Sequence, residues 1–268
     1  MKNKKNYYFG KYYKFISPSG YAFALIDANT VKGRVVQLIT KEKSYQIKNP
    51  TGVKIQDDSV LSLDIHQKDL NISGMIYISN VHPLKKDVMG VLRYVKMNTK
   101  HNVYSMYHSL EGELKINNKI ISFNDGYGYI EGDEGYTFPD KYIWFNSIGE
   151  NFGVTMSIAR ISLFKKIHLM GAFLIVKDNE HEFVFSTLNG LKITNIGQYL
   201  ITLKKGKYKF RLFLDDYVSL PLLSPIEGHL VNTIGENLSI KVGYELFKGK
   251  EKIFSKYNVD SSIERVNL

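Results

Sequence analysis

The feature that most constrains this chain is an apolar alternation with a period of two residues, which recurs along its whole length. Runs such as 207–212 (Lys-Tyr-Lys-Phe-Arg-Leu) and 238–242 (Leu-Ser-Ile-Lys-Val) place apolar side chains at every second position. This period is typical of β-strands that bury one face. Turn-forming pairs separate the runs, among them Ser19-Gly20, Asp125-Gly126, Asn189-Gly190 and Lys205-Gly206. The sequence therefore predicts an all-β protein built from antiparallel barrels or sandwiches.

Local signals agree with this fold class. The clearest hairpin runs through 112–116 and 119–123, joined by Asn117-Asn118, because asparagine tolerates the positive φ of a two-residue turn. The best candidate for a helix of ten or more residues is 83–95, and Gly90 weakens its helical periodicity. No period of 20–50 residues repeats, which disfavours solenoids and propellers.

Composition excludes several kinds of chemistry. The chain has 268 residues, of which 44% are hydrophobic, so it can bury a large core. It has no cysteine, which excludes disulfides, cysteine-ligated zinc, iron–sulfur clusters and a thiol nucleophile. The seven histidines form no recognisable metal-ligand spacing, and we expect no metal site.

Charge and hydropathy indicate where the protein acts. The longest strongly apolar run, 169–176, is too short to cross a bilayer, and no secretory signal is readable, so we expect a cytoplasmic protein. Residues 1–50 carry ten basic and two acidic side chains. Only five of the 36 basic residues are arginine and no nucleic-acid motif is present, so we expect no nucleic-acid partner. The basic N-terminal region is compatible with peripheral contact with an anionic membrane. No sequence feature indicates an oligomeric state.

The segment 124–147 holds the most informative residues, including the only tryptophan of the chain. If 127–133 is extended, Tyr127, Tyr129, Glu131 and Asp133 share one face. A carboxyl beside aromatic rings in a dry site has a raised pKa and can act as a general acid. The alternative is structural: the two carboxylates accept backbone N–H bonds in a glycine-rich bend, and the aromatic residues belong to the core.

This segment resembles the signature of the tocopherol cyclase family. The resemblance lies in Gly128-Tyr129-Ile130-Glu131, Asp133, Gly135, Phe138-Pro139 and Tyr142-Ile143-Trp144, in the expected order and spacing. Weaker similar blocks extend from about residue 8 to 245, such as Tyr12-Tyr13-Lys14-Phe15 and the run 185–193. The resemblance implies a calycin-like fold of two lipocalin-like antiparallel halves around an apolar pocket. We expect the halves at 1–147 and 148–268.

The resemblance also implies an activity. Tocopherol cyclases protonate a prenyl alkene and let a phenolic oxygen capture the carbocation, and related carotenoid hydratases let water add; neither needs a metal or redox cofactor. We therefore expect a hydrophobic, prenyl- or lipid-like small molecule as ligand and no cofactor. The implied roles are Asp133 as proton donor and Glu131 as its orienting neighbour, with Tyr129, Tyr136 and Trp144 as pocket walls.

Further candidate ligand-binding residues are Tyr127, Asn146 and His108. His101 and His108 lie near the signature and can serve as base or donor, or as structural groups.

The chain departs from the family pattern at two positions. Glu134 follows the motif aspartate where the family has tryptophan, and Ile148 stands where the family has asparagine. These departures indicate a different substrate. Two other functional interpretations stay open: a lipocalin-like carrier or sensor that holds a prenyl or fatty ligand unchanged, and an interaction protein with a filled interior.

Overall fold

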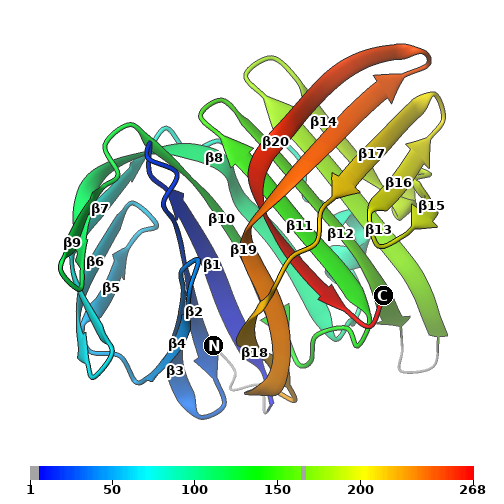
Figure 1. Cartoon of the computed structure of the whole chain (residues 1–268). Helices are drawn as coiled ribbons and strands as arrows, with labels where there is room; N and C mark the ends of the chain where they lie inside the picture. Colours follow the sequence, from blue (N-terminus) through cyan, green and yellow to red (C-terminus); the bar gives the residue numbers. More distant parts are fainter. Residues whose placement is uncertain (1–5, 164–166) are drawn as a thin grey trace.

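The protein folds into two curled antiparallel sheets that lie side by side (Figure 1). The computed structural model describes residues 6–163 and 167–268. Residues 1–5, which belong to the basic N-terminal region discussed above, lie outside the described residues. The two curled sheets confirm the predicted all-β antiparallel class and the two-half, lipocalin-like architecture.

Each sheet takes up one half of the described chain. The first sheet contains β1 (Tyr8–Ile16), β2 (Ala22–Thr30), β3 (Gly33–Ile39), β4 (Ser44–Lys48), β5 (Val53–Gln56), β6 (Val60–Gln67), β7 (Leu70–Ser79), β8 (Thr99–Ile116), β9 (Lys119–Ser122) and β10 (Gly126–Gly135). The second contains β11 (Tyr142–Gly149), β12 (Phe152–Leu163), β13 (Ile167–Asp178), β14 (Glu182–Ser186), β15 (Lys192–Ile196), β16 (Leu200–Lys205), β17 (Tyr208–Leu214), β18 (Leu220–Ile226), β19 (His229–Lys248) and β20 (Glu251–Val266). Two 3₁₀ helices complete the described elements, η1 (Gly90–Tyr94) and η2 (Thr187–Asn189).

The two sheets follow nearly the same plan. The first has the strand order β4-β3-β2-β1-β10-β8-β7-β6-β5, and the second has β14-β13-β12-β11-β20-β19-β17-β16-β15. In both, the first four strands form a meander, and the last strand of the half returns to pair with the first strand. β1 and β11 therefore occupy equivalent central positions.

Strand alternation distributes the apolar side chains among three cores. One core lies within each curled sheet, and a third lies between the sheets. On β1, Tyr13 and Phe15 enter the core of the first sheet, whereas Tyr12 and Ile16 enter the core between the sheets. Every residue of β11 is buried for the same reason. Both central strands thus have two buried faces.

The predicted hairpin is confirmed, and the helical expectation is corrected. β8 pairs with β9 from Glu113↔Ser122 to Ile116↔Lys119, and Asn117 has a φ of 53° in the turn. The segment 83–95 forms only the 3₁₀ helix η1. Val88, Met89 and Leu92 line a cavity between the sheets, whereas Val91 and Tyr94 are exposed.

The chain changes sheets between Gly135 and Tyr142. β11 therefore belongs to the second sheet, and the segment 124–147 contributes to both. Among the described residues, no helix has the length and apolar character needed to cross a membrane.

Candidate active site

A cavity of about 430 Å³ lies between the two sheets. Its lining comes from β1, β2, β3, β8 and β10 of the first sheet and from β11, β12, β13, β14, β18, β19 and β20 of the second, together with the 136–141 crossing segment and residues of η1 and η2. Most of its wall is apolar, and representative lining residues are Ile26, Val88, Leu92, Phe138, Trp144 and Phe173. This size and lining suit a small hydrophobic molecule.

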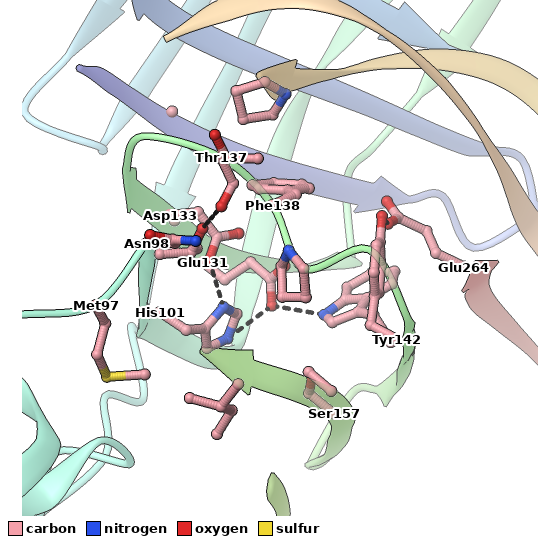
Figure 2. Close-up of a pocket in the computed structure, with 18 of the residues that line it drawn as sticks. Met97, Asn98, His101, Glu131, Asp133, Thr137, Phe138, Tyr142, Ser157 and Glu264 are labelled. Carbon is pink, nitrogen blue, oxygen red and sulfur yellow. Dashed lines mark hydrogen bonds and ion pairs between the residues drawn. The ribbon is translucent and has the colours of Figure 1, made fainter. Parts of the chain in front are cut away.

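Three titratable side chains meet at the wall of this cavity. β8 and β10 pair so that His101 lies directly opposite Asp133, which puts both side chains on one face of the sheet. The Nδ1 atom of His101 lies 3.1 Å from Oδ1 of Asp133, and its Nε2 atom lies 3.3 Å from Oε2 of Glu131 (Figure 2). We call these three residues the His101 triad. Both ring nitrogens therefore face a carboxylate oxygen.

This geometry keeps the imidazole of His101 positively charged. Burial alone lowers the pKa of a histidine, but the charges of Glu131 and Asp133 outweigh burial and raise the pKa of His101 to about 10. The triad thus carries an imidazolium between two carboxyl groups at neutral pH. Asp133 is the more accessible of the two acids, with 24% of its side chain exposed against 7% for Glu131.

Glu131 is held in place by two aromatic donors, one from β10 and one from β11. Its Oε2 atom accepts a hydrogen bond from the Tyr129 hydroxyl at 2.5 Å and one from Nε1 of Trp144 at 3.0 Å. The ring of Tyr12, whose residue pairs with Glu131 across β1 and β10, packs edge-on against Trp144 at 5.3 Å. Glu131 is therefore a buried acid among aromatic rings.

The His101 triad can also offer metal ligands. One ligand atom from each residue lies within 4.8 Å of the others. We expected no metal site, because the three residues have no recognisable spacing in sequence. Pairing of β8 with β10 brings them together, but both nitrogens of His101 already contact a carboxylate. A metal would have to displace one of these contacts.

Two buried carboxyl groups that sequence reasoning missed lie in the second sheet. Glu264 of β20 lines the cavity, and Oε2 of its carboxyl accepts a hydrogen bond from the Tyr142 hydroxyl at 2.7 Å. Figure 2 shows Glu264 beside Tyr142, apart from Asp133. Glu236 of β19 is fully buried, and its Oε1 atom accepts a hydrogen bond from the Tyr12 hydroxyl at 2.8 Å. Neither acid lies in a recognisable motif, so no local signal marked them.

The remaining predicted ligand-binding residues lie around the cavity rather than in its lining. Tyr129 is fully buried behind Glu131, Tyr127 packs in the core between the sheets, and Tyr136 packs edge-on against Tyr7 at 5.4 Å. Asn146 is fully buried, and its amide has no hydrogen-bond partner among the described residues. Trp144, Glu131 and Asp133 do line the cavity.

His108 lies in a separate buried position. Its Nδ1 atom lies 3.1 Å from Oγ of Ser105, and burial lowers the pKa of His108 to about 3. His108 is therefore a neutral imidazole outside the cavity lining, whereas His101 is the histidine that contacts both predicted acids.

The two departures from the family pattern also have distinct environments. Glu134 points away from the cavity and accepts a hydrogen bond from the Tyr7 hydroxyl at 2.6 Å. Ile148 is buried in the core between the sheets. Glu134 therefore does not add a carboxylate to the cavity wall, because alternation along β10 places it on the opposite face from Asp133.

Comparisons with known proteins identify the fold. No family model matches the sequence, and no curated protein matches it. A candidate ATTH protein of Nitrosomonas europaea superimposes with a TM-score of 0.55 and 9% identity over 98% of this chain and 93% of its own. Kievitone hydratase of Nectria haematococca superimposes with a TM-score of 0.53 and 10% identity over 97% of this chain and 89% of its own. At such low identity the likeness concerns architecture: the chain shares the two-half, lipocalin-like antiparallel fold of these proteins.

Proposed function

We propose that this protein binds a hydrophobic small molecule in the cavity between its sheets and catalyses acid-initiated hydration or cyclisation of a prenyl double bond. The observation that carries the proposal is an apolar cavity of about 430 Å³ with a buried carboxyl–imidazolium group in its wall. A hydratase of the same fold and the resemblance to the tocopherol cyclase family support the same reaction type. No cofactor is required for this chemistry.

The reaction begins with proton transfer. The proton comes from the imidazolium of His101, which passes it to Asp133 through the 3.1 Å contact. Asp133 gives this proton to the less substituted carbon of the alkene, which leaves a tertiary carbocation and a neutral imidazole. The oxygen of water or of a substrate hydroxyl then forms the new C–O bond and releases its proton, which returns to His101. Protons therefore balance over one turnover.

The walls suit the intermediate. Trp144 lines the cavity, and its indole is fixed by the hydrogen bond to Glu131 and the edge contact with Tyr12. An aromatic face stabilises a nearby cation by about 0.5–2 kcal/mol. Because the apolar lining excludes water, it also limits premature capture of the carbocation.

A carrier or sensor is the second candidate. It is favoured by the way both acids of the His101 triad have a partner within the protein, since His101 contacts Glu131 and Asp133. In this case the triad would be a structural ion pair and the ligand would leave unchanged.

Deuterium incorporation tests the proposal. The purified protein is incubated in D₂O with prenylated phenols and quinols, and products are analysed by mass spectrometry. Alkene protonation places one non-exchangeable deuterium on carbon in each product. Asp133→Asn is expected to lower turnover by about 10²-fold or more, since a positioned general acid contributes about 10²–10⁴-fold.

Glu134→Gln supplies the matched control. It changes the next residue of β10, an acid that lies outside the cavity lining, and is expected to retain turnover. Equal turnover in Asp133→Asn and the wild type would remove Asp133 from the mechanism. A prenyl ligand that co-purifies and never gains deuterium would select the carrier.

A further inference from the structure

A second acid centre lies on the other sheet. β20 is flanked by β11 and β19, and Glu264 lies directly opposite Trp144 on one side and directly opposite Glu236 on the other. Directly opposed residues of antiparallel strands share one face of the sheet. The carboxyls of Glu264 and Glu236 are therefore neighbours, and only Glu264 lines the cavity. We call these two residues the Glu264 pair.

The surroundings of the Glu264 pair contain too little positive charge for two carboxylates. The groups that face it are Tyr142 of β11, Tyr12 and Lys14 of β1, and Glu131 and Asp133 of β10. The positive charge of His101 is already shared between Glu131 and Asp133. Lys14 is fully buried without a hydrogen-bond partner for its Nζ atom among the described residues, and burial lowers its pKa to about 7. It cannot supply a full counter-charge at neutral pH.

Each carboxyl of the Glu264 pair accepts a tyrosine hydrogen bond at one oxygen, so its second oxygen can carry a proton. Tyr142 donates to one oxygen of Glu264, and Tyr12 donates to one oxygen of Glu236. The other oxygen of Glu236, Oε2, is buried and has no hydrogen-bond partner among the described residues. Two like charges at directly opposed positions are unfavourable even on an exposed sheet, and the dry interior increases the cost.

We propose that the Glu264 pair holds at least one proton at neutral pH and that Glu264 donates a hydrogen bond from the cavity wall to a neutral oxygen of the ligand. The ligand class is then an apolar molecule with a carbonyl, hydroxyl or phenol oxygen. A fatty carboxylate is disfavoured because it would add a further negative charge to a cavity whose wall already holds the carboxylates Glu131 and Asp133 around a single imidazolium. The inference rests on the proposed function only in placing the ligand in this cavity.

The titration behaviour of the pair agrees with its geometry. Burial raises the pKa of Glu236 to about 8. Burial and the charge of Glu236 together raise the pKa of Glu264 well above its usual range. Such groups form a coupled pair that gives up its protons in two steps.

Trp144 provides an internal reporter for the first test. It is the only tryptophan and lies directly opposite Glu264, so its emission is expected to change when the pair ionises. The emission is titrated from pH 4 to 10 in the wild type, in Glu264→Gln, and in the control Glu251→Gln, which alters an exposed position of the same strand. The wild type and the control should share a transition above pH 6, and Glu264→Gln should remove it or shift its midpoint by at least one pH unit.

Infrared spectroscopy gives a readout that does not depend on tryptophan. The wild type at pH 7 should show a carboxylic acid C=O band that shifts in D₂O and weakens in Glu264→Gln. Retention of the full band and of the fluorescence transition in Glu264→Gln would overturn the proposal. Circular dichroism checks that Glu264→Gln is folded. If it is unfolded, the comparison of farnesal with farnesoic acid below still tests the proposal, because that comparison uses the wild type.

The second test compares a neutral and a charged ligand. Farnesal and farnesoic acid share one prenyl skeleton, and their binding at pH 7, where farnesoic acid is ionised, is followed by quenching of Trp144. Farnesal is expected to bind at least tenfold more tightly to the wild type. Glu264→Met, which removes the O–H donor without supplying the amide N–H that glutamine would, should weaken farnesal about threefold to tenfold, the equivalent of about one hydrogen bond, and should leave the hydrocarbon farnesane unaffected. Equal or tighter binding of farnesoic acid, or no binding of farnesal, would overturn the proposal.

The outcomes separate this inference from the proposed function. Preferential farnesal binding without deuterium incorporation into any substrate supports the Glu264 pair and contradicts catalysis. Deuterium incorporation that survives in both Glu264 variants, together with unchanged titration in Glu264→Gln and unchanged farnesal binding in Glu264→Met, supports catalysis and contradicts the Glu264 pair.

Discussion

At the scale of single residues, the centre of this protein is notable for buried polar groups that pair with tyrosines. Tyr129 donates to Glu131, Tyr142 donates to Glu264, and Tyr12 donates to Glu236. Each phenol supplies a donor where water is excluded and brings an apolar ring to the cavity or to the core behind it. Several acids can therefore lie in or near the wall of an apolar cavity, because a tyrosine hydroxyl replaces water as the hydrogen-bond donor to each of them.

Glu236 makes folding stability depend on pH. Its pKa is about 8 in the folded protein because of burial, against an ordinary value of 4.5. Its contribution to stability is therefore complete below pH 4.5 and is lost as pH rises toward 8. Glutamine at this position stays neutral at every pH. We therefore expect the melting temperature of Glu236→Gln minus that of the wild type to increase as pH rises from 5 to 8, by about 2–4 °C for each kcal/mol of stability that the wild type loses. Differential scanning calorimetry measures this difference; a difference independent of pH would contradict the assignment.

Lys14 lowers the folding stability of the protein when it is charged. Its ammonium group has no hydrogen-bond partner among the described residues and is fully buried between the sheets. We expect Lys14→Met to stabilise the protein at pH 6 by about 1–3 kcal/mol, because a buried unpaired polar group is removed. Urea denaturation measures the change, with exposed Lys48→Met as control. A loss of stability in Lys14→Met would show that Lys14 pairs favourably with Glu236.

Much of the site around the His101 triad could be predicted from the sequence, whereas the Glu264 pair on the second sheet could not. The alternation in 127–133 predicts that Tyr129, Glu131 and Asp133 share a face, and the tocopherol cyclase resemblance added Trp144. His101 was one of two candidate histidines, but only the β8–β10 register selects it over His108. Glu264 and Glu236 are single acids far along the chain, and a strand's own sequence does not reveal which strand it will pair with.

At the scale of elements, β10 is the strand on which the site depends. It pairs with β1 on one side and with β8 on the other, with a register shift in the β8 pairing near Ile130. Gly128 lies where these three strands approach one another closely. A Cβ atom there would lie 2.2 Å from Nε2 of His108 and 2.7 Å from the backbone oxygen of Lys14. Glycine is therefore required by space at this position.

Gly128→Ala tests the close approach of these strands. We expect a loss of about 1–3 kcal/mol of folding stability from overpacking, because the backbone of β1 cannot move as easily as a side chain. Chemical denaturation measures the loss, and Gly10→Ala on β1, whose Cβ atom would lie at an ordinary 3.6 Å from Ala28, gives a control for glycine replacement without a steric clash. Equal effects of the two changes would contradict a steric role for Gly128.

At the scale of the whole molecule, the cavity exists only where the two sheets meet. The core between them takes residues from both, including Tyr12 and Tyr129 from the first and Trp144 and Leu238 from the second. Separating the sheets would expose this apolar surface together with the buried polar groups. The fold class and the two-half architecture were predictable from period-two alternation and the family resemblance, whereas the meeting face depends on contacts between distant segments.

The halves are therefore expected to depend on each other. Fragments 1–138 and 139–268, expressed separately, should aggregate or stay unfolded, because each exposes its share of the core between the sheets. Expressed together, they should form a stable 1:1 complex, which size-exclusion chromatography and circular dichroism can detect. A folded, monomeric fragment alone would contradict this dependence.

The shared strand order of the two sheets has an evolutionary consequence. A chain that carries one structural plan twice is compatible with duplication and fusion of an ancestral gene, and the ancestral product would then have formed the cavity between two identical subunits. Fusion frees each wall to accumulate its own substitutions. One wall now holds the imidazolium and its acids and the other holds a carboxyl pair, an asymmetry that no homodimer of one half could encode.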